Sequence, residues 1–146
     1  MSLIRSLIFA VLQTVLTIFF SLVALLSFPF PAHTRYRLIT GYNRIVIWLA
    51  CRVLGIRYVV EGRENLPAQP AIILAKHQSA WETVAFLCLF PPVSPVIKQE
   101  LLKVPFFGWA FRMLSPIAID RDGGREALRQ IVAQGKDKLA QGFWVL

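Results

Sequence analysis

The sequence of 146 residues is short of cysteine, histidine and acidic side chains, and each shortage narrows what the protein can be. Its two cysteines, Cys51 and Cys88, lie in apolar surroundings and lack the spacing of metal ligands. We therefore expect two buried thiols in a reduced compartment, and neither a disulfide framework nor a metal site. The two histidines leave few candidates for an imidazole that exchanges protons near neutral pH. The sequence shows no internal repeat and no low-complexity segment.

The scarcity of acidic residues leaves the chain strongly basic. Eight acidic side chains stand against 16 lysines and arginines, which gives a formal net charge of +8 at pH 7. Hydrophobic residues make up 56% of the sequence, and its mean hydropathy of +0.58 is too high for an ordinary soluble domain. Basic charge attracts both nucleic acid and anionic lipid, but the apolar content favours a membrane. The length corresponds to one domain with an appendage.

The hydrophobic residues are concentrated at the start of the chain. Residues 6–30 carry no charge, and the stretch from Leu7 to Phe28 is long enough to span a bilayer as a helix at about 1.5 Å per residue. A signal peptide is the alternative, but its apolar core is usually shorter, and residues 29–31 (Pro-Phe-Pro) do not form a small-residue cleavage site. We predict a retained membrane helix that these prolines end.

A second helix is predicted from about Tyr36 to Leu54. Apolar residues recur there at three- and four-residue steps and share a face: Leu38, Tyr42, Ile45, Leu49 and Val53. The arginines of this region suit a helix that lies in the membrane interface, although a helix packed on the globular part fits the same pattern. Residues 1–55 are thus predicted to form a membrane-associated helical segment. The excess of arginine after the first helix places the rest of the chain in the cytoplasm.

From Gly55 onward the hydrophobic pattern changes. Short runs typical of strands cover residues 57–61, 71–75, 95–97, 116–120 and 143–146. They alternate with helical patterns that begin near Ser79, Phe106 and Gly124, the last with Leu128, Ile131, Val132 and Leu139 on one side. Alternating strands and helices indicate an α/β domain over residues 56–146. Because the sequence stops inside a predicted strand, we expect this domain to be incomplete.

Residues 77–82 (His-Gln-Ser-Ala-Trp-Glu) are the strongest candidates for chemistry. His77 follows the predicted buried strand 71–75, and the carboxyl ends of strands in open α/β sheets are where ligands collect. An imidazole supported by a carboxylate such as Glu82 can take a proton from an alcohol. The alternative is structural, because Ser79 and Glu82 also fit a capping box. Pairing of His77 with Glu82 requires His77 to precede the helix, since five positions along a regular helix do not share a face.

Several blocks of the sequence resemble the glycerolipid acyltransferases. Residues 77–82 are similar to the first signature block of that family, His-x-x-x-x-Asp, and residues 117–121 (Ile-Ala-Ile-Asp-Arg) to the second. Residues 98–101 (Lys-Gln-Glu-Leu) resemble the basic segment between those blocks, and residues 105–109 (Pro-Phe-Phe-Gly-Trp) match the Pro-x-x-Gly-Trp that follows it. The resemblance covers about residues 56–146. Glu82 stands where the family usually has aspartate, and the family's third block, Phe-Pro-Glu-Gly-Thr-Arg, would follow Leu146.

The resemblance implies an α/β fold with a mixed sheet flanked by helices, preceded by a hydrophobic two-helix membrane segment. It implies transfer of an acyl group from acyl-CoA or acyl-carrier protein to the free hydroxyl of a lysophosphatidate at the bacterial inner membrane, facing the cytoplasm. His77 would be the general base, Glu82 its partner, and Arg121 with Lys98 would bind the substrate phosphate. No cofactor, metal or nucleic acid is expected.

Alternatives to these assignments stay open at this point. The acceptor could be another lysolipid or glycerol 3-phosphate, and a non-catalytic lipid-binding module of the same fold fits as well. From the residues alone, Arg121 could instead form a surface ion pair with Asp120 or Asp122. Trp109 suits an acyl groove or simple core packing, and Ser79 is interpreted as a helix cap and not as an acyl carrier.

Overall fold

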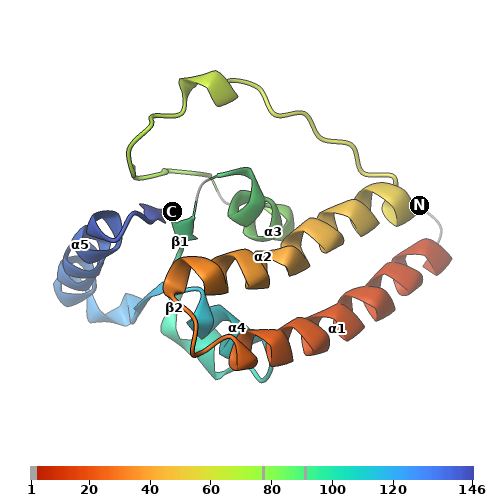
Figure 1. Cartoon of the computed structure of the whole chain (residues 1–146), viewed down its shortest axis with the longest axis horizontal. Helices are drawn as coiled ribbons and strands as arrows, with labels where there is room; N and C mark the ends of the chain where they lie inside the picture. The colour runs from red at the N-terminus through yellow and green to blue at the C-terminus, as the bar shows by residue number, and fades with distance from the viewer. Residues whose placement is uncertain (1–2, 77, 91) are drawn as a thin grey trace.

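The computed structural model describes residues 3–76, 78–90 and 92–146, and Figure 1 shows the arrangement of their helices and strands. In chain order the elements are α1 (Leu3–Leu26), α2 (Ala32–Leu49), a π-helical turn (Ala50–Leu54), α3 (Ala80–Leu89), β1 (Val93–Ser94), β2 (Val96–Lys98), α4 (Phe107–Met113), β3 (Ile117–Ile119), α5 (Arg125–Ala140) and β4 (Trp144–Val145). Short 3-10 turns at Arg63–Asn65, Gln99–Lys103 and Arg121–Gly123 join them.

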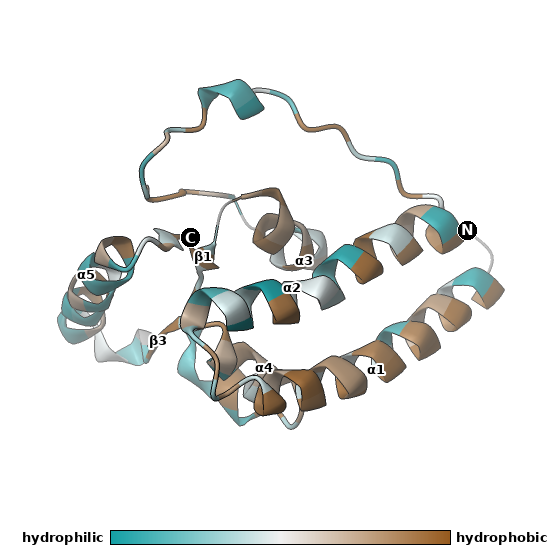
Figure 2. Cartoon of the chain, in the orientation of Figure 1, coloured by the Kyte–Doolittle hydropathy of each residue, from teal (hydrophilic) through white to brown (hydrophobic). Residues whose placement is uncertain are grey.

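Helix α1 is the predicted membrane helix, and it starts a few residues earlier than expected. Within the described residues it is the one helix long and apolar enough to cross a membrane. Only 11% of its most apolar 18-residue stretch is buried in the protein. In Figure 2 hydrophobic residues follow one another along most of this helix. Two of its hydroxyl side chains bond to the helix backbone: Thr14 donates to Ala10 O at 2.9 Å and Thr17 to Gln13 O at 2.8 Å. The hydroxyl hydrogens of these two threonines are therefore paired on a surface suited to lipid.

Helix α2 is amphipathic, so only the first of the two predicted helices is apolar enough to span a bilayer. It begins at Ala32 and passes into the π-helical turn that ends at Gly55, where φ is +72°. Its buried face carries Tyr36, Ile39, Asn43, Val46 and Ile47. The apolar face predicted from spacing is a different one, since Leu38 and Ile45 lie exposed beside Trp48. That exposed face is available to lipid, as an interfacial helix requires.

The sheet lies behind the helices and consists of parallel pairs. Strand β1 pairs with β4, with Val93 opposite Trp144, and β2 pairs with β3, with Lys98 opposite Ile119. Only Pro95 separates β1 from β2, so the two pairs form one layer. The strands predicted at 95–97, 116–120 and 143–146 are confirmed, as is the α/β class. The pairs seen within the described residues are all parallel, and the antiparallel pairing of a mixed sheet is not among them.

The strands predicted at residues 57–61 and 71–75 are wrong. Residues 57–61 have no regular structure, and in the second run only Ile72 forms an isolated parallel bridge with Val145. Leu74 is 94% exposed, whereas Ala71 and Ile73 are partly buried against the core, so the burial expected for the second run holds only in part. In the first run β-branched composition favours a strand but supplies no partner. The second run has a partner in β4, since Ile73 N–H donates to Val145 O at 2.7 Å and Val145 N–H to Ala71 O at 3.1 Å, but it forms no more than the isolated bridge at Ile72. In Figure 1 this part of the chain arcs away from the helices between α2 and α3.

Helix α5 packs on the sheet through small residues and through two of the four large ones that its spacing suggested, Ile131 and Leu139. Ala127 and Gly135 are buried, and a Cβ on Gly135 would lie within about 4 Å of Val145 and Ile117 side-chain atoms. The other two, Leu128 and Val132, are exposed. At Gly135, where α5 lies close to β3 and β4, the inner face has room for only a small side chain.

Candidate active site

The motif at residues 77–82 starts helix α3. Ser79 is the N-cap in an extended conformation, and its hydroxyl accepts a hydrogen bond from the Trp81 backbone N–H at 3.2 Å. The Glu82 carboxylate in turn accepts from the Ser79 backbone N–H at 2.7 Å and from its hydroxyl at 3.2 Å. The capping box predicted from the spacing is therefore confirmed, and Ser79 is a helix cap.

The same bonds prepare Glu82 for a second task. Desolvation raises the pKa of the Glu82 carboxyl, but the hydrogen bonds from Ser79 outweigh it, so the pKa lies below its ordinary value. Glu82 is thus a fixed carboxylate at neutral pH. His77 lies outside the described residues, and its pairing with Glu82 stays a prediction. The helix begins at Ala80, after position 77, so the regular-helix spacing that argued against the pair does not apply.

The two cations predicted to bind phosphate follow neighbouring strands. Lys98 is the last residue of β2, and Arg121 comes two residues after β3. Because β2 and β3 are parallel and Lys98 lies opposite Ile119, both positions lie at the same edge of the sheet. Lys98 Nζ is 3.9 Å from a Glu100 carboxylate oxygen, and both side chains are about half exposed. The Arg121 side chain lies outside the described part of the structure, and with it the alternative ion pairs to Asp120 and Asp122.

The turn after β3 is capped by the side chain of Asp120. The Asp120 carboxylate accepts a hydrogen bond from the Asp122 backbone N–H at 3.0 Å, which caps the short 3-10 turn Arg121–Gly123. The acidic neighbour therefore has a structural task of its own.

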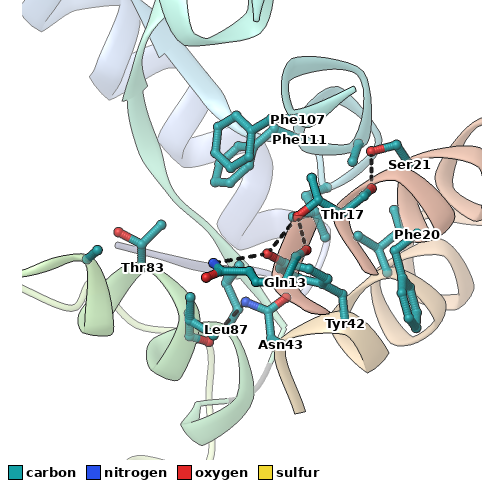
Figure 3. A pocket seen from close by; sticks show the side chains of 15 residues that line it. Gln13, Thr17, Phe20, Ser21, Tyr42, Asn43, Thr83, Leu87, Phe107 and Phe111 are labelled. Carbon is teal, nitrogen blue, oxygen red and sulfur yellow. Dashed lines mark hydrogen bonds between the residues drawn. The ribbon is translucent and has the colours of Figure 1, made fainter. Parts of the chain in front are cut away.

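An apolar cavity of about 340 Å³ lies between α1, α2, α3 and α4, as Figure 3 shows. Helix α3 contributes Ala80 and Thr83, which flank Glu82 on the first turn, and Val84 and Leu87 beyond them. Helix α4 contributes Phe107 and Phe111, whose rings are 4.9 Å apart. The cavity thus begins at the turn that carries the motif and is closed on its other side by the membrane helix.

A few polar groups are set into the wall of this cavity (Figure 3). The Tyr42 hydroxyl lies 3.1 Å from the Thr17 hydroxyl and accepts from Gln13 Nε2 at 3.5 Å. Asn43 Nδ2 donates to Val84 O at 3.0 Å and joins α2 to α3. The sequence analysis did not predict that these residues line a cavity. The polar side chains of Gln13 and Thr17 within an uncharged apolar run were the available sign that this part of the first helix faces protein.

The block at residues 105–109 forms the turn into α4. Trp109 is 40% exposed and packs on Phe106 at 5.1 Å, so it lies neither in the core nor among the residues that line the cavity. Its neighbours Phe107 and Phe111 take that place. Phe106 has a positive φ of 61°, and its carbonyl accepts a hydrogen bond from the buried Ser21 hydroxyl of α1 at 2.9 Å. The membrane helix thus holds a strained turn of the site.

The cysteines lie apart from this arrangement. Both are free thiols and only half-buried, which corrects the expectation of full burial. Burial raises the pKa of the Cys88 thiol, and nearby Arg44 partly offsets that effect. The Cys88 thiol donates weakly to Thr40 O at 3.8 Å.

Comparison with known protein families identifies the class of protein to which this chain belongs. Residues 57–146, which include every predicted site residue, match the family described as Acyltransferase, and the chain belongs to that family. The resemblance found in the signature blocks is therefore confirmed.

Individual relatives narrow the comparison to particular enzymes within this family. Over 117 residues the chain is 51% identical to the 1-acyl-sn-glycerol-3-phosphate acyltransferase of Pseudomonas aeruginosa, covering 80% of this chain and 46% of that protein. A protein with the same description from Saccharomyces cerevisiae is 32% identical over 97 residues, covering 60% of this chain and 32% of that protein. The chain therefore spans less than half the length of these two relatives.

A solved structure confirms the fold. The crystal structure of the 1-acyl-sn-glycerophosphate (LPA) acyltransferase PlsC from Thermotoga maritima matches 99% of this chain and 58% of that one, with a TM-score of 0.71 and 26% identity.

Proposed function

We propose that this chain carries the catalytic motif of an O-acyltransferase that moves a fatty acyl group from an acyl thioester to the free hydroxyl of 1-acyl-glycerol 3-phosphate, forming phosphatidic acid. One observation carries the proposal: the fixed carboxylate of Glu82 sits on the first turn of α3, beside an apolar cavity that the membrane helix closes. A reactive polar group next to an apolar lipid-sized cavity suits a lipid substrate. The activity named for the Pseudomonas and Thermotoga relatives supports the same reaction.

The proposed chemistry starts with His77 as general base. Its imidazole removes the proton of the substrate hydroxyl, whose oxygen attacks the thioester carbonyl carbon. A new ester C–O bond forms, the C–S bond breaks, and the imidazolium returns its proton to the departing thiolate. Glu82 holds the imidazole tautomer and stabilises the imidazolium, for which a permanently ionised carboxylate is needed. The low pKa of Glu82 meets that need at neutral pH.

Arg121 and Lys98 are proposed to bind the phosphate of the acceptor. Their positions at one edge of the parallel sheet allow both to reach a single phosphate group. A guanidinium offers a fork of donors to phosphate oxygens, and an ammonium adds a point charge. The exposed Lys98–Glu100 contact at 3.9 Å is weak enough for a phosphate to displace it.

The cavity is proposed to hold an acyl chain of one of the substrates. Its wall is mostly apolar, and α1, which supplies part of it, is itself suited to lipid. A chain could therefore pass from the bilayer to the motif without crossing water. The acyl donor is acyl-CoA or acyl-carrier protein, and the proposed reaction needs no cofactor or metal ion.

The proposed site of action is the bacterial inner membrane, with the chemistry facing the cytoplasm. The support is helix α1, whose one charged residue is Arg5 near its start, followed by several arginines along α2, which the positive-inside rule places on the cytoplasmic side. Acyl-CoA and acyl-carrier protein are cytoplasmic donors, so this orientation brings both substrates to one face.

The test is transfer to lysophosphatidate by the complete protein that contains this chain. With either donor it should form phosphatidic acid. Arg121→Ala and Lys98→Ala should lower kcat/KM for lysophosphatidate by the loss of a charged contact, about 2–5 kcal/mol for a bidentate one, but spare an uncharged monoacylglycerol. Arg129→Ala is the matched control, because Arg129 is exposed and pairs only weakly with Glu126 at 3.7 Å. Equal losses on both acceptors would assign Arg121 and Lys98 to the fold. Absence of any transfer would favour the non-catalytic lipid-binding module.

A further inference from the structure

The first turn of α2 is fixed against the end of α5. His33 Nε2 lies 3.0 Å from the Gln141 carbonyl oxygen, and the His33 ring stacks on Phe143 at 4.5 Å with 24° between the ring planes. Phe143 is buried in the core and leads into β4. The junction of these two helices is therefore held by both a polar and an aromatic contact, and it is a defined place in the fold.

Two cations, Arg35 and Lys138, lie at this junction of α2 and α5. The Arg35 Nε is buried and has no hydrogen-bond acceptor among the residues that the structure describes. Burial lowers the pKa of Lys138; its neighbour Asp137 raises that pKa, and Arg35 lowers it again. In the described ranges neither Arg35 nor Lys138 has a carboxylate within 4 Å. Partly buried like charges and a buried donor without an acceptor are unfavourable unless an anion completes the cluster.

The junction lies next to the end of the membrane helix. Helix α1 ends at Leu26, and α2 starts at Ala32, only three residues before Arg35. Between them, Phe28 and Phe30 are 68% and 51% exposed. Exposed phenylalanines beside arginine and lysine at the end of an apolar helix are typical of the depth at which lipid headgroups lie.

This place is separate from the proposed catalytic site. Lys98 and Arg121 follow the carboxyl ends of parallel strands, whereas Phe143 precedes β4 at the opposite, amino end of the same layer. An anion at the α2–α5 junction therefore does not compete with the acceptor phosphate.

We propose that Arg35 and Lys138 together bind the phosphate of an anionic membrane phospholipid, at a structural lipid site distinct from the substrate site. The terminal N–H groups of the guanidinium, beyond the buried Nε, and the ammonium share one phosphate, which offsets the repulsion between the two cations. Binding there fixes the α1–α2 turn at headgroup depth. The proposal goes beyond the acyl transfer and depends only on membrane association.

The test is partition of the complete protein onto vesicles of phosphatidylcholine with and without phosphatidylglycerol. Arg35→Ala and Lys138→Ala should each lower partition onto the anionic vesicles about fivefold and leave the neutral ones unchanged. Because both cations hold the same phosphate, the double variant should lose little more than either single one. Arg37→Ala, on the exposed side of α2, is the matched control: its effect should multiply with that of Lys138→Ala.

Four results would overturn the proposal. Multiplying effects of Arg35→Ala and Lys138→Ala would show two independent surface charges. Equal losses on neutral vesicles would place the partner within the protein. Displacement by inorganic phosphate at matched ionic strength would indicate a site for free phosphate. If Arg35→Ala unfolds the protein, Lys138→Ala decides alone, and unchanged partition of that variant onto anionic vesicles rejects the lipid site.

Discussion

At the scale of the residue, Glu82 combines two tasks that are usually given to different side chains. Its carboxylate closes the capping box of α3 and, in the proposed mechanism, orients His77. The two tasks need different properties, since a cap needs only an acceptor at that position, whereas an imidazolium needs a negative charge. Substitutions that keep one property and remove the other can therefore separate them.

Glu82→Gln should keep the start of α3 and lose the charge. We expect a thermal midpoint at neutral pH that is slightly below that of the wild type, with a transfer rate lower by about 10²–10⁴, as for a base deprived of its carboxylate. Glu82→Ala should lower the midpoint further and the rate as much, because the acceptor that completes the capping box is lost as well. Thermal unfolding and initial rates measure the two effects. Full activity of Glu82→Gln would make Glu82 a cap and nothing more.

The lowered pKa of Glu82 adds a pH dependence with a definite sign. A carboxyl whose pKa is lower in the folded protein stabilises the fold at pH above its ordinary value, and that contribution is lost as the pH falls through the folded pKa. The stability advantage of the wild type over Glu82→Gln should therefore be largest near neutrality and shrink in acid. An advantage independent of pH would mean that the carboxylate charge does not stabilise the cap.

At the scale of the element, α4 depends on a glycine. A Cβ on Gly108 would lie 2.5 Å from the Leu102 carbonyl oxygen and 2.8 Å from that of Leu101, both of them backbone atoms that cannot turn aside. The first turn of α4 therefore lies directly on the preceding 3-10 turn, and the phenylalanines of the cavity wall are placed by this contact.

Gly108→Ala should displace α4 from that turn. We expect a loss of about 1–3 kcal/mol of stability, and altered acyl-chain preference, because Phe107 and Phe111 line the cavity. Arg112→Gly, at an exposed position of the same helix that does not line the cavity, is the comparison: it lowers helix propensity by about 1 kcal/mol without the backbone clash. Chemical denaturation and rates with donors of different chain length measure both effects. A Gly108→Ala variant as stable as the wild type would contradict the close packing.

Elements were predictable from sequence where local signals and tertiary packing agree. The capping box predicted the start of α3, and Gly55 ended the second predicted helix, whereas the parallel pairing that places Lys98 and Arg121 at one edge came only with the structure. The run at 57–61 failed because a strand also needs a neighbour, which propensity does not contain, and the run at 71–75 pairs with β4 only around Ile72. The cavity was not predictable, since it exists only where α1 packs against α2, α3 and α4.

At the scale of the whole molecule, helix α1 has two roles. Its outer face suits contact with lipid, and its inner face forms part of the cavity wall. Ser21 holds the Phe106 turn, and Gln13 and Thr17 contact Tyr42 of α2. The length and hydropathy of α1 were evident in the sequence, but its role in the cavity required the packing.

Membrane attachment should therefore resist salt. Burial of the apolar surface of α1 is not screened by ions, whereas the arginines of α2 add only about 1 kcal/mol each near anionic lipid. Membrane fractions washed in high salt or in carbonate should retain the complete protein. A peripheral protein bound mainly by charge provides the control and should be released. Recovery of the protein in the salt wash would contradict a membrane-embedded α1.

The central claim of the account is that His77 is the general base of acyl transfer, and the rate of His77→Ala tests it most directly. Initial rates of phosphatidic acid formation should be measured with the complete protein at saturating lysophosphatidate, together with its membrane retention and thermal midpoint. We expect the rate to fall by about 10²–10⁴ while retention and midpoint stay unchanged. A rate within a few-fold of the wild type would contradict the assignment of His77.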